Sequence, residues 1–101
     1  MLVIAGTIRI DPDRQADAVP AAVEMMEATR AEPGCVSYTF SASLAEPGVI
    51  HVFEEWKDQT ALDAHFASPH MARFQQAIGG FGIRGVDLHR YEVASKGPMG
   101  G

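Results

Sequence analysis

Hydrophobic and polar residues alternate along four segments of the chain, and each alternation predicts a β-strand. The first segment, residues 2–10, is rich in β-branched residues and apolar on both sides of the alternation, which is typical of a strand buried on two faces. The other three segments are residues 35–44, 49–57 and 83–94. A loop containing Pro47-Gly48 separates the second segment from the third, so these two are predicted to form a hairpin.

The intervals between the predicted strands carry helical spacing and helix-end signals. Asp11-Pro12 can start a first helix and Pro33-Gly34 ends it, while Pro20 predicts a kink or an irregular first turn. Asp58 and Ser68-Pro69 are start signals for two shorter helices after the third strand. The order β-α-β-β-α-β, with the second helix broken, predicts an α+β fold: a ferredoxin-like split βαβ sandwich with a four-stranded antiparallel sheet.

One face of this predicted sheet has no helix to cover it. We assign to that outer face the side of the first strand that carries Leu2, Ile4 and Ile8. Such a face is too apolar to remain in water, and a second copy of the chain would cover it. The sequence therefore predicts a homodimer formed through the sheets.

Composition narrows the class of protein. The 101 residues suit one domain, which we expect to span residues 1–94, followed by a Gly-rich flexible tail over residues 95–101. The net charge is −5 and the eight Lys and Arg form no stripe, so no nucleic-acid partner is expected. No apolar run approaches a bilayer span and the chain begins directly with a strand, which favours a cytoplasmic protein without a membrane partner.

His65 and His70 are the main candidates for chemistry. An imidazole accepts or gives a proton near neutral pH, so either histidine could deprotonate a phenolic substrate. A role in packing or helix capping is the alternative for both. No metal is expected, because ligand pairs on a helix usually lie about three or four residues apart, whereas these two are five apart with Pro69 between them.

Three further polar or aromatic residues are expected to face the helices. Trp56 could form the wall of an aromatic pocket, and the Tyr38 hydroxyl could reach the same cavity. An inward Glu54 must be paired or protonated. A structural role in the core is the alternative for each of them. Phe74, on the apolar side of the last predicted helix, is expected to shape the same pocket.

Taken together, Glu32-Pro33-Gly34-Cys35, Tyr38, Glu54-Glu55-Trp56, His65 and Ser68-Pro69-His70 form a string that resembles antibiotic-biosynthesis monooxygenase domains. The resemblance extends from Met1 to about Glu92. It implies a ferredoxin-like protein whose sheets pair in a dimer to form a shared α+β barrel. Some members of that family oxidise phenols with O2 and without metal or flavin.

The resemblance also assigns positions. Trp56 matches an active-site tryptophan, whereas Val52 and Leu62 stand where some members have a pocket asparagine and a pocket tyrosine. Gln75 stands where haem-degrading relatives have their iron ligand, so haem is not expected. The paired histidines resemble those of quinol monooxygenases and of an isomerase that acts on a phosphorylated sugar.

These observations lead to one hypothesis and two alternatives. The hypothesis is a cofactor-independent monooxygenase that oxidises a small quinol or phenol with O2, with His65 as the base and His70 orienting it or the substrate. The alternatives are a dimeric module that binds a small hydrophobic ligand without turnover, and an isomerase that uses the same histidines. The substrate-binding residues assigned under the hypothesis are Trp56, Tyr38, Glu54, Phe74, Val52 and Leu62.

Overall fold

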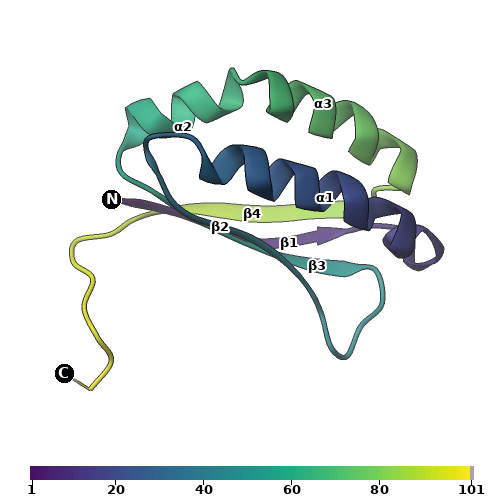
Figure 1. Cartoon of the computed structure of the whole chain (residues 1–101). Coiled ribbons are helices and arrows are strands. Elements are labelled where there is room, and N and C mark those ends of the chain that lie inside the picture. Colours follow the sequence, from purple (N-terminus) through teal and green to yellow (C-terminus); the bar gives the residue numbers. More distant parts are fainter. Residues whose placement is uncertain (101) are drawn as a thin grey trace.

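The computed structural model describes residues 1–100; Gly101, the last residue of the expected tail, lies outside the described residues. Figure 1 shows one sheet with a layer of helices on one side of it. The elements follow in the order β1 (Leu2–Arg9), η1 (Pro12–Arg14), α1 (Gln15–Arg30), β2 (Cys35–Ala42), β3 (Val49–Trp56), α2 (Gln59–Phe66), α3 (Pro69–Ile78), η2 (Gly79–Phe81) and β4 (Gly85–Glu92).

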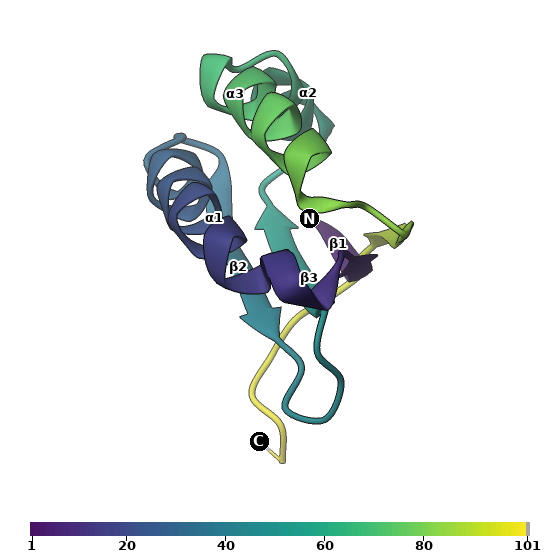
Figure 2. The same ribbon diagram turned by 90° about the vertical axis from the view of Figure 1, so that its right-hand side faces the viewer.

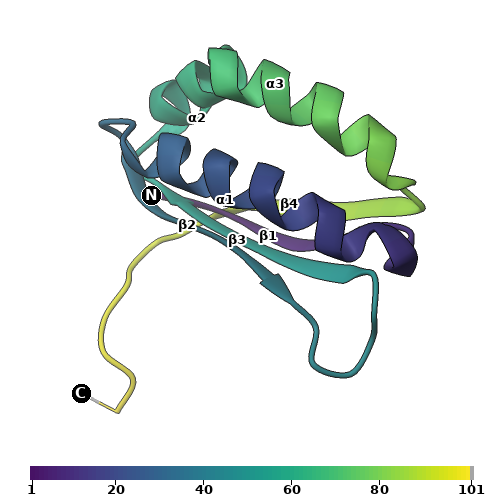
Figure 3. The same cartoon turned by 45° about the vertical axis from the view of Figure 1, so that its right-hand side comes forward.

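The four strands form a single sheet in the order β2-β3-β1-β4, and each neighbouring pair is antiparallel. The end-on view in Figure 2 places all the helices on the same face of the sheet. In Figure 3, α2 and α3 follow one another along that face and α1 runs beside them. This arrangement is the α+β ferredoxin-like fold that the sequence predicts.

The predicted helix starts are confirmed by side-chain caps. Asp11 precedes the short helix η1 and its carboxylate accepts a hydrogen bond from the Asp13 amide. The Asp58 carboxylate caps α2 and the Ser68 hydroxyl caps α3. Helix α1 runs from Gln15 to Arg30 through Pro20 as one segment, and the short helix η1 precedes it without including Pro20. Within residues 1–100, no helix combines the length and the apolar character that crossing a membrane requires.

The assignment of the faces of β1 was wrong. Leu2 and Ile8 are only 6% and 8% exposed and belong to the two core clusters under the helices, and Ile4 packs against the first of them. Both sides of β1 are largely apolar, so the alternation separated two sets of residues without identifying the set that the helices cover.

The outer face of the sheet carries the other set of β1 residues. By register, Ala5 lies between Phe53 of β3 and His89 of β4, and Val3 lies between Glu55 and Tyr91. Phe53 is 44% exposed and the Tyr91 side chain is also exposed. The outer face is therefore mixed, with large apolar groups among charged and polar ones.

Candidate functional site

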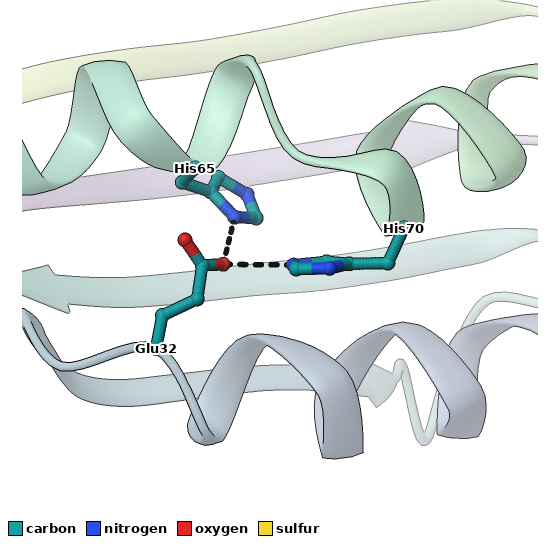
Figure 4. Close-up of side chains that lie close together, drawn as sticks. All are labelled: Glu32, His65 and His70. Carbon is teal, nitrogen blue, oxygen red and sulfur yellow. Dashed lines mark hydrogen bonds and ion pairs between the residues drawn. The ribbon is translucent and has the colours of Figure 1, made fainter.

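Glu32, His65 and His70 meet at one end of the helical layer. A single carboxylate oxygen, Glu32 Oε2, lies 2.7 Å from Nδ1 of His65 and 2.8 Å from Nε2 of His70 (Figure 4). The side chain of His65 is fully buried and that of His70 is 13% exposed. One partly buried carboxylate thus holds two imidazole rings, whose centroids are 5.9 Å apart.

Local structure brings these three side chains together from separate elements. Glu32 lies in the turn between α1 and β2, where its amide bonds to the Thr29 carbonyl and its own carbonyl accepts from the Cys35 amide. Gly34 in the same turn lies against Ala61 of α2, and a β-carbon at residue 34 would collide with the Ala61 methyl group. The turn can therefore approach α2 closely because residue 34 is glycine.

The break between α2 and α3 positions the two histidines. His65 lies in the last turn of α2, and its carbonyl accepts hydrogen bonds from both the amide and the hydroxyl of Ser68. The same hydroxyl caps α3, in which His70 is the second residue. Ser68-Pro69 therefore turns the chain so that histidines five residues apart face the same carboxylate.

The contacts assign the protons of the two rings. A carboxylate accepts hydrogen bonds, so His65 donates from Nδ1 and His70 donates from Nε2. Burial lowers the pKa of His65, although the hydrogen bond that its ring donates to Glu32 acts in the opposite direction. The neutral ring then carries a lone pair on Nε2, a buried atom that has no hydrogen-bond partner among the described residues.

The same three residues could offer two nitrogens and a carboxylate oxygen to a metal ion, since their donor atoms lie within 4.8 Å of one another. Ligation through Nδ1 of His65 would put the proton on Nε2. Histidine ligands almost always donate that second N–H to an acceptor, and His65 Nε2 has none among residues 1–100. The donor set therefore suits a hydrogen-bonded cluster better than a metal centre.

Aromatic rings and a second buried carboxyl surround His65. Its ring centroid lies 4.7 Å from that of Trp56 and 5.3 Å from that of Tyr38. The Trp56 indole donates to Glu54 Oε1 over 2.9 Å. Burial raises the pKa of the Glu54 carboxyl, partly offset by that hydrogen bond, and burial also raises the pKa of the Tyr38 phenol.

A cavity of about 150 Å³ lies between α1, α3 and the sheet. Its wall is apolar and includes Met26, Phe40 and Phe74. Gln15 is its one polar lining residue, and the Gln15 side-chain oxygen already accepts from the Gly48 amide over 2.7 Å. This cavity suits an apolar ring but offers no titratable group.

A smaller cavity of about 80 Å³ lies between α1 and α3 and is lined by His70, Arg73, Glu24 and Phe74, among others. Phe74 thus lines both cavities, and its ring stacks on Phe40 at a centroid distance of 5.4 Å. Of the two histidines, His70 is the one that borders a cavity.

The residues assigned from the sequence fall into two groups. His65 and His70 bond to Glu32, and Trp56 and Tyr38 pack against His65. Glu54 accepts from the Trp56 indole, and Phe74 lines the two cavities. Leu62 and Val52 are buried in the first and second core clusters, respectively, and line neither cavity. Trp56, Tyr38 and Glu54 likewise line neither cavity.

The sequence analysis missed Glu32 as a functional candidate. Glu32-Pro33-Gly34 was interpreted only as the end of a helix, and Glu32 is 33 and 38 residues from its two histidine partners. The one local signal was a carboxylate beside a Pro-Gly turn, which does not identify what the carboxylate faces.

Two curated relatives match much of this chain. The Synechocystis protein sll1783, which has no assigned function in its name, is 30% identical over 93 residues, covering 92% of this chain and 63% of its own. The Mycobacterium tuberculosis protein named "Putative monooxygenase Rv0793" is 40% identical over 55 residues, 54% of each chain. The residues matched in these sequences therefore make up less than two thirds of the length of either relative.

Solved structures match more completely. The structure of Rv0793 has a TM-score of 0.82 at 30% identity and covers 96% of this chain and 97% of its own. The structure of a Deinococcus radiodurans protein named "putative antibiotic biosynthesis monooxygenase" has a TM-score of 0.90 at 26% identity and full coverage of both chains. The family model for antibiotic biosynthesis monooxygenases matches residues 1–77. The chain belongs to the antibiotic biosynthesis monooxygenase family.

Proposed function

We propose that this protein is a cofactor-independent monooxygenase that oxidises a small quinol or phenol with O2. The observation that carries the proposal is the Glu32 carboxylate, which holds two imidazole rings, one of them at the smaller cavity, while Phe74 lines both this cavity and the apolar cavity of about 150 Å³. The names of two relatives, Rv0793 and YcnE of Bacillus subtilis, include the word monooxygenase. A held imidazole can take the phenolic proton, and an apolar cavity can hold the aromatic ring and keep water away from the later steps.

In the proposed reaction, an imidazole first removes the phenolic proton. The phenolate then supplies electrons to O2, and one oxygen atom bonds to a ring carbon that bears hydrogen, which is the carbon opposite the hydroxyl in a phenol and a carbon beside a hydroxyl in a quinol. That carbon loses its hydrogen, the ring becomes a quinone, and the second oxygen atom leaves as water together with the two hydrogens. The substrate is the reductant, so the protein supplies the base, the orientation and the dry surroundings.

The geometry favours His70 as the base that meets the substrate, in place of His65. The His65 side chain is fully buried, whereas His70 borders the smaller cavity. With Nε2 of His70 donating to Glu32, its Nδ1 remains free to accept a proton. Glu32 would stabilise the resulting imidazolium, and His65 would hold Glu32 from the other side. His65 is then a positioning residue.

Oxygen uptake with 1,4-naphthohydroquinone and 1-naphthol tests the proposal. His70→Ala should lower kcat by about 10²- to 10⁴-fold, the usual contribution of a positioned base. His65→Ala should lower it less. The control is Asp63→Ala, since the Asp63 side chain is exposed on α2, bonds to Gln59 and lines neither cavity.

Two results would contradict the proposal. A parent protein that consumes no oxygen above background with any quinol or naphthol would exclude this reaction for those compounds and favour another function. Full activity in His70→Ala would mean that His70 is not the base, even if oxygen is consumed.

A second candidate is a binding module without turnover, and one observation favours it. The larger cavity has no titratable side chain in its wall, so it could hold an apolar ligand without acting on it. Binding of 1-naphthol that raises the melting temperature, with no oxygen uptake, would support this candidate.

We also infer that the functional unit is a homodimer whose sheets pack face to face. The support is the mixed outer face, where Phe53, Tyr91 and Val36 are exposed on a chain of 10.9 kDa. A second copy would cover these side chains.

A further inference from the structure

Phe74 separates two cavities that differ in chemistry. Between residues 1 and 100 it is the one residue that lines both the larger cavity and the smaller one. The larger cavity offers apolar contact without a titratable group, and the smaller one offers His70 but has only about 80 Å³. A ligand seated in the larger cavity therefore also contacts His70 only if it extends past the ring of Phe74.

The volumes limit what can bind without movement. An apolar protein cavity of about 150 Å³ is able to hold one benzene molecule. The larger cavity has about that volume, so a single ring would fit there without contacting His70. A ligand with two fused rings needs more space, and the space behind Phe74 is the smaller cavity.

Phe74 is held in a way that permits a change of rotamer. Its ring stacks on Phe40, with an angle of 19° between the planes, and both rings face the larger cavity. It projects from α3, in which no residue is fully buried. If the Phe74 ring turns, it loses its stacking contact with Phe40, and an aromatic ligand could replace that contact.

The geometry points to Phe74 as the residue that determines which ligands reach His70. Without a ligand, the Phe74 ring separates the larger cavity from the smaller one. When a phenol with two fused rings binds, the ring turns aside, the two cavities join, and the ligand hydroxyl lies against Nδ1 of His70. This inference rests on the proposed function only in taking a phenol as the ligand.

The experiment measures contact with His70 directly by NMR. Histidine is labelled with carbon-13, and the Cε1–Hε1 signal of His70 is assigned by its loss in His70→Gln. Phenol, with one ring, and 1-naphthol, with two, are titrated into the parent protein. We expect 1-naphthol to shift the His70 signal and phenol to bind without shifting it.

Phe74→Ala and Phe81→Ala form a matched pair, because Phe81 lines only the larger cavity. In Phe74→Ala the partition is gone, so phenol should now shift the His70 signal. In Phe81→Ala the larger cavity grows but the partition stays, so phenol should still leave His70 unchanged. Phe74→Leu, which keeps an apolar side chain on α3, should behave like Phe74→Ala and serves if the alanine variant does not fold.

Several results would overturn the inference: no binding of 1-naphthol, equal shifts of His70 by phenol and 1-naphthol in the parent, or no shift by phenol in the Phe74 variants. Oxygen uptake is measured separately, so the two proposals can fail independently. A His70 shift without oxygen uptake supports the partition and contradicts the monooxygenase. Oxygen uptake without a His70 shift supports the monooxygenase and contradicts the partition.

Discussion

The imidazole of His65 lies against the indole of Trp56, with their ring centroids 4.7 Å apart and an angle of 36° between the planes. Both side chains are fully buried. The indole N–H donates to Glu54 on one side, and the imidazole donates to Glu32 on the other. The buried carboxyl group of Glu54 and the partly buried one of Glu32 are thus joined through a pair of packed rings, so changes at Trp56 should affect the stability of the core.

Trp56→Phe should lower the free energy of unfolding. The substitution removes the hydrogen-bond donor of Glu54, and an unsatisfied buried carboxyl costs about 1–3 kcal/mol. The smaller ring also leaves a void, which adds to the loss. Urea unfolding measures the total. In a Glu54→Leu background the same substitution should cost less, because no carboxyl is then left without a donor. An equal cost in both backgrounds would contradict the role given to the indole N–H.

Glu54→Gln should make the protein more stable at high pH relative to the parent. The pKa of Glu54 is raised in the folded state, chiefly by burial. A raised carboxyl pKa favours the folded state below the unfolded-state value of about 4.3, and that contribution is lost as the pH rises through the folded-state pKa. Glutamine is neutral throughout and its oxygen can still accept from the Trp56 indole.

Urea midpoints of parent and Glu54→Gln at a series of pH values between 4 and 8 test this prediction. The difference should grow in favour of the variant as the pH rises. Glu24→Gln is the control, because Glu24 is exposed and pairs with Arg73 on the surface. A constant difference across the range would show that Glu54 does not titrate as its burial implies.

The helix starts and the order of the elements along the chain were predictable because their signals are local. Asp58 and Ser68 cap their helices with side chains that bond within three residues, so a short window of sequence contains the whole interaction. The histidines were identified for the same reason, as a residue type with distinct chemistry on either side of a helix break. The carboxylate to which both histidines bond, that of Glu32, was not identified.

The contacts of Glu32 and the faces of β1 depend on packing between distant segments. Glu32 reaches His65 only because the turn at Gly34 approaches α2, and nothing near residue 32 in the sequence specifies that approach. The two sides of β1 are similarly apolar, and the side that the helices cover is the one that carries Leu2 and Ile8. In both cases tertiary contacts decide what the local pattern leaves open.

Zinc should not bind tightly to the Glu32, His65 and His70 cluster. Binding through Nδ1 of His65 would leave its Nε2 proton buried without an acceptor, and that loss weakens a metal site. Titration calorimetry with zinc on the parent and on Glu32→Gln should give no stoichiometric heat that depends on Glu32. Tight binding of one zinc ion per chain that disappears in Glu32→Gln would contradict the hydrogen-bonded cluster.

Phe53→Glu should convert the inferred dimer into a monomer. Phe53 lies on the outer face, beside Ala5 of β1 and Thr39 of β2, and is 44% exposed in the single chain. In a dimer whose sheets pack face to face, a glutamate there would bury an unpaired charge against the partner sheet, which is strongly unfavourable. Sedimentation at micromolar concentration should give about twice the chain mass for the parent and 10.9 kDa for the variant.

The control for this change is Phe66→Glu. Phe66 is also an exposed phenylalanine, but it lies at the end of α2 in the helical layer, on the opposite side of the sheet from Phe53. This variant should remain a dimer, and circular dichroism should give the same secondary structure for both variants. A monomeric parent, or a Phe53→Glu variant that sediments with the parent, would exclude the outer face as the dimer interface. Dissociation of both variants would mean that the helical layer also takes part, because an added charge at Phe66 cannot act through the far face of the sheet.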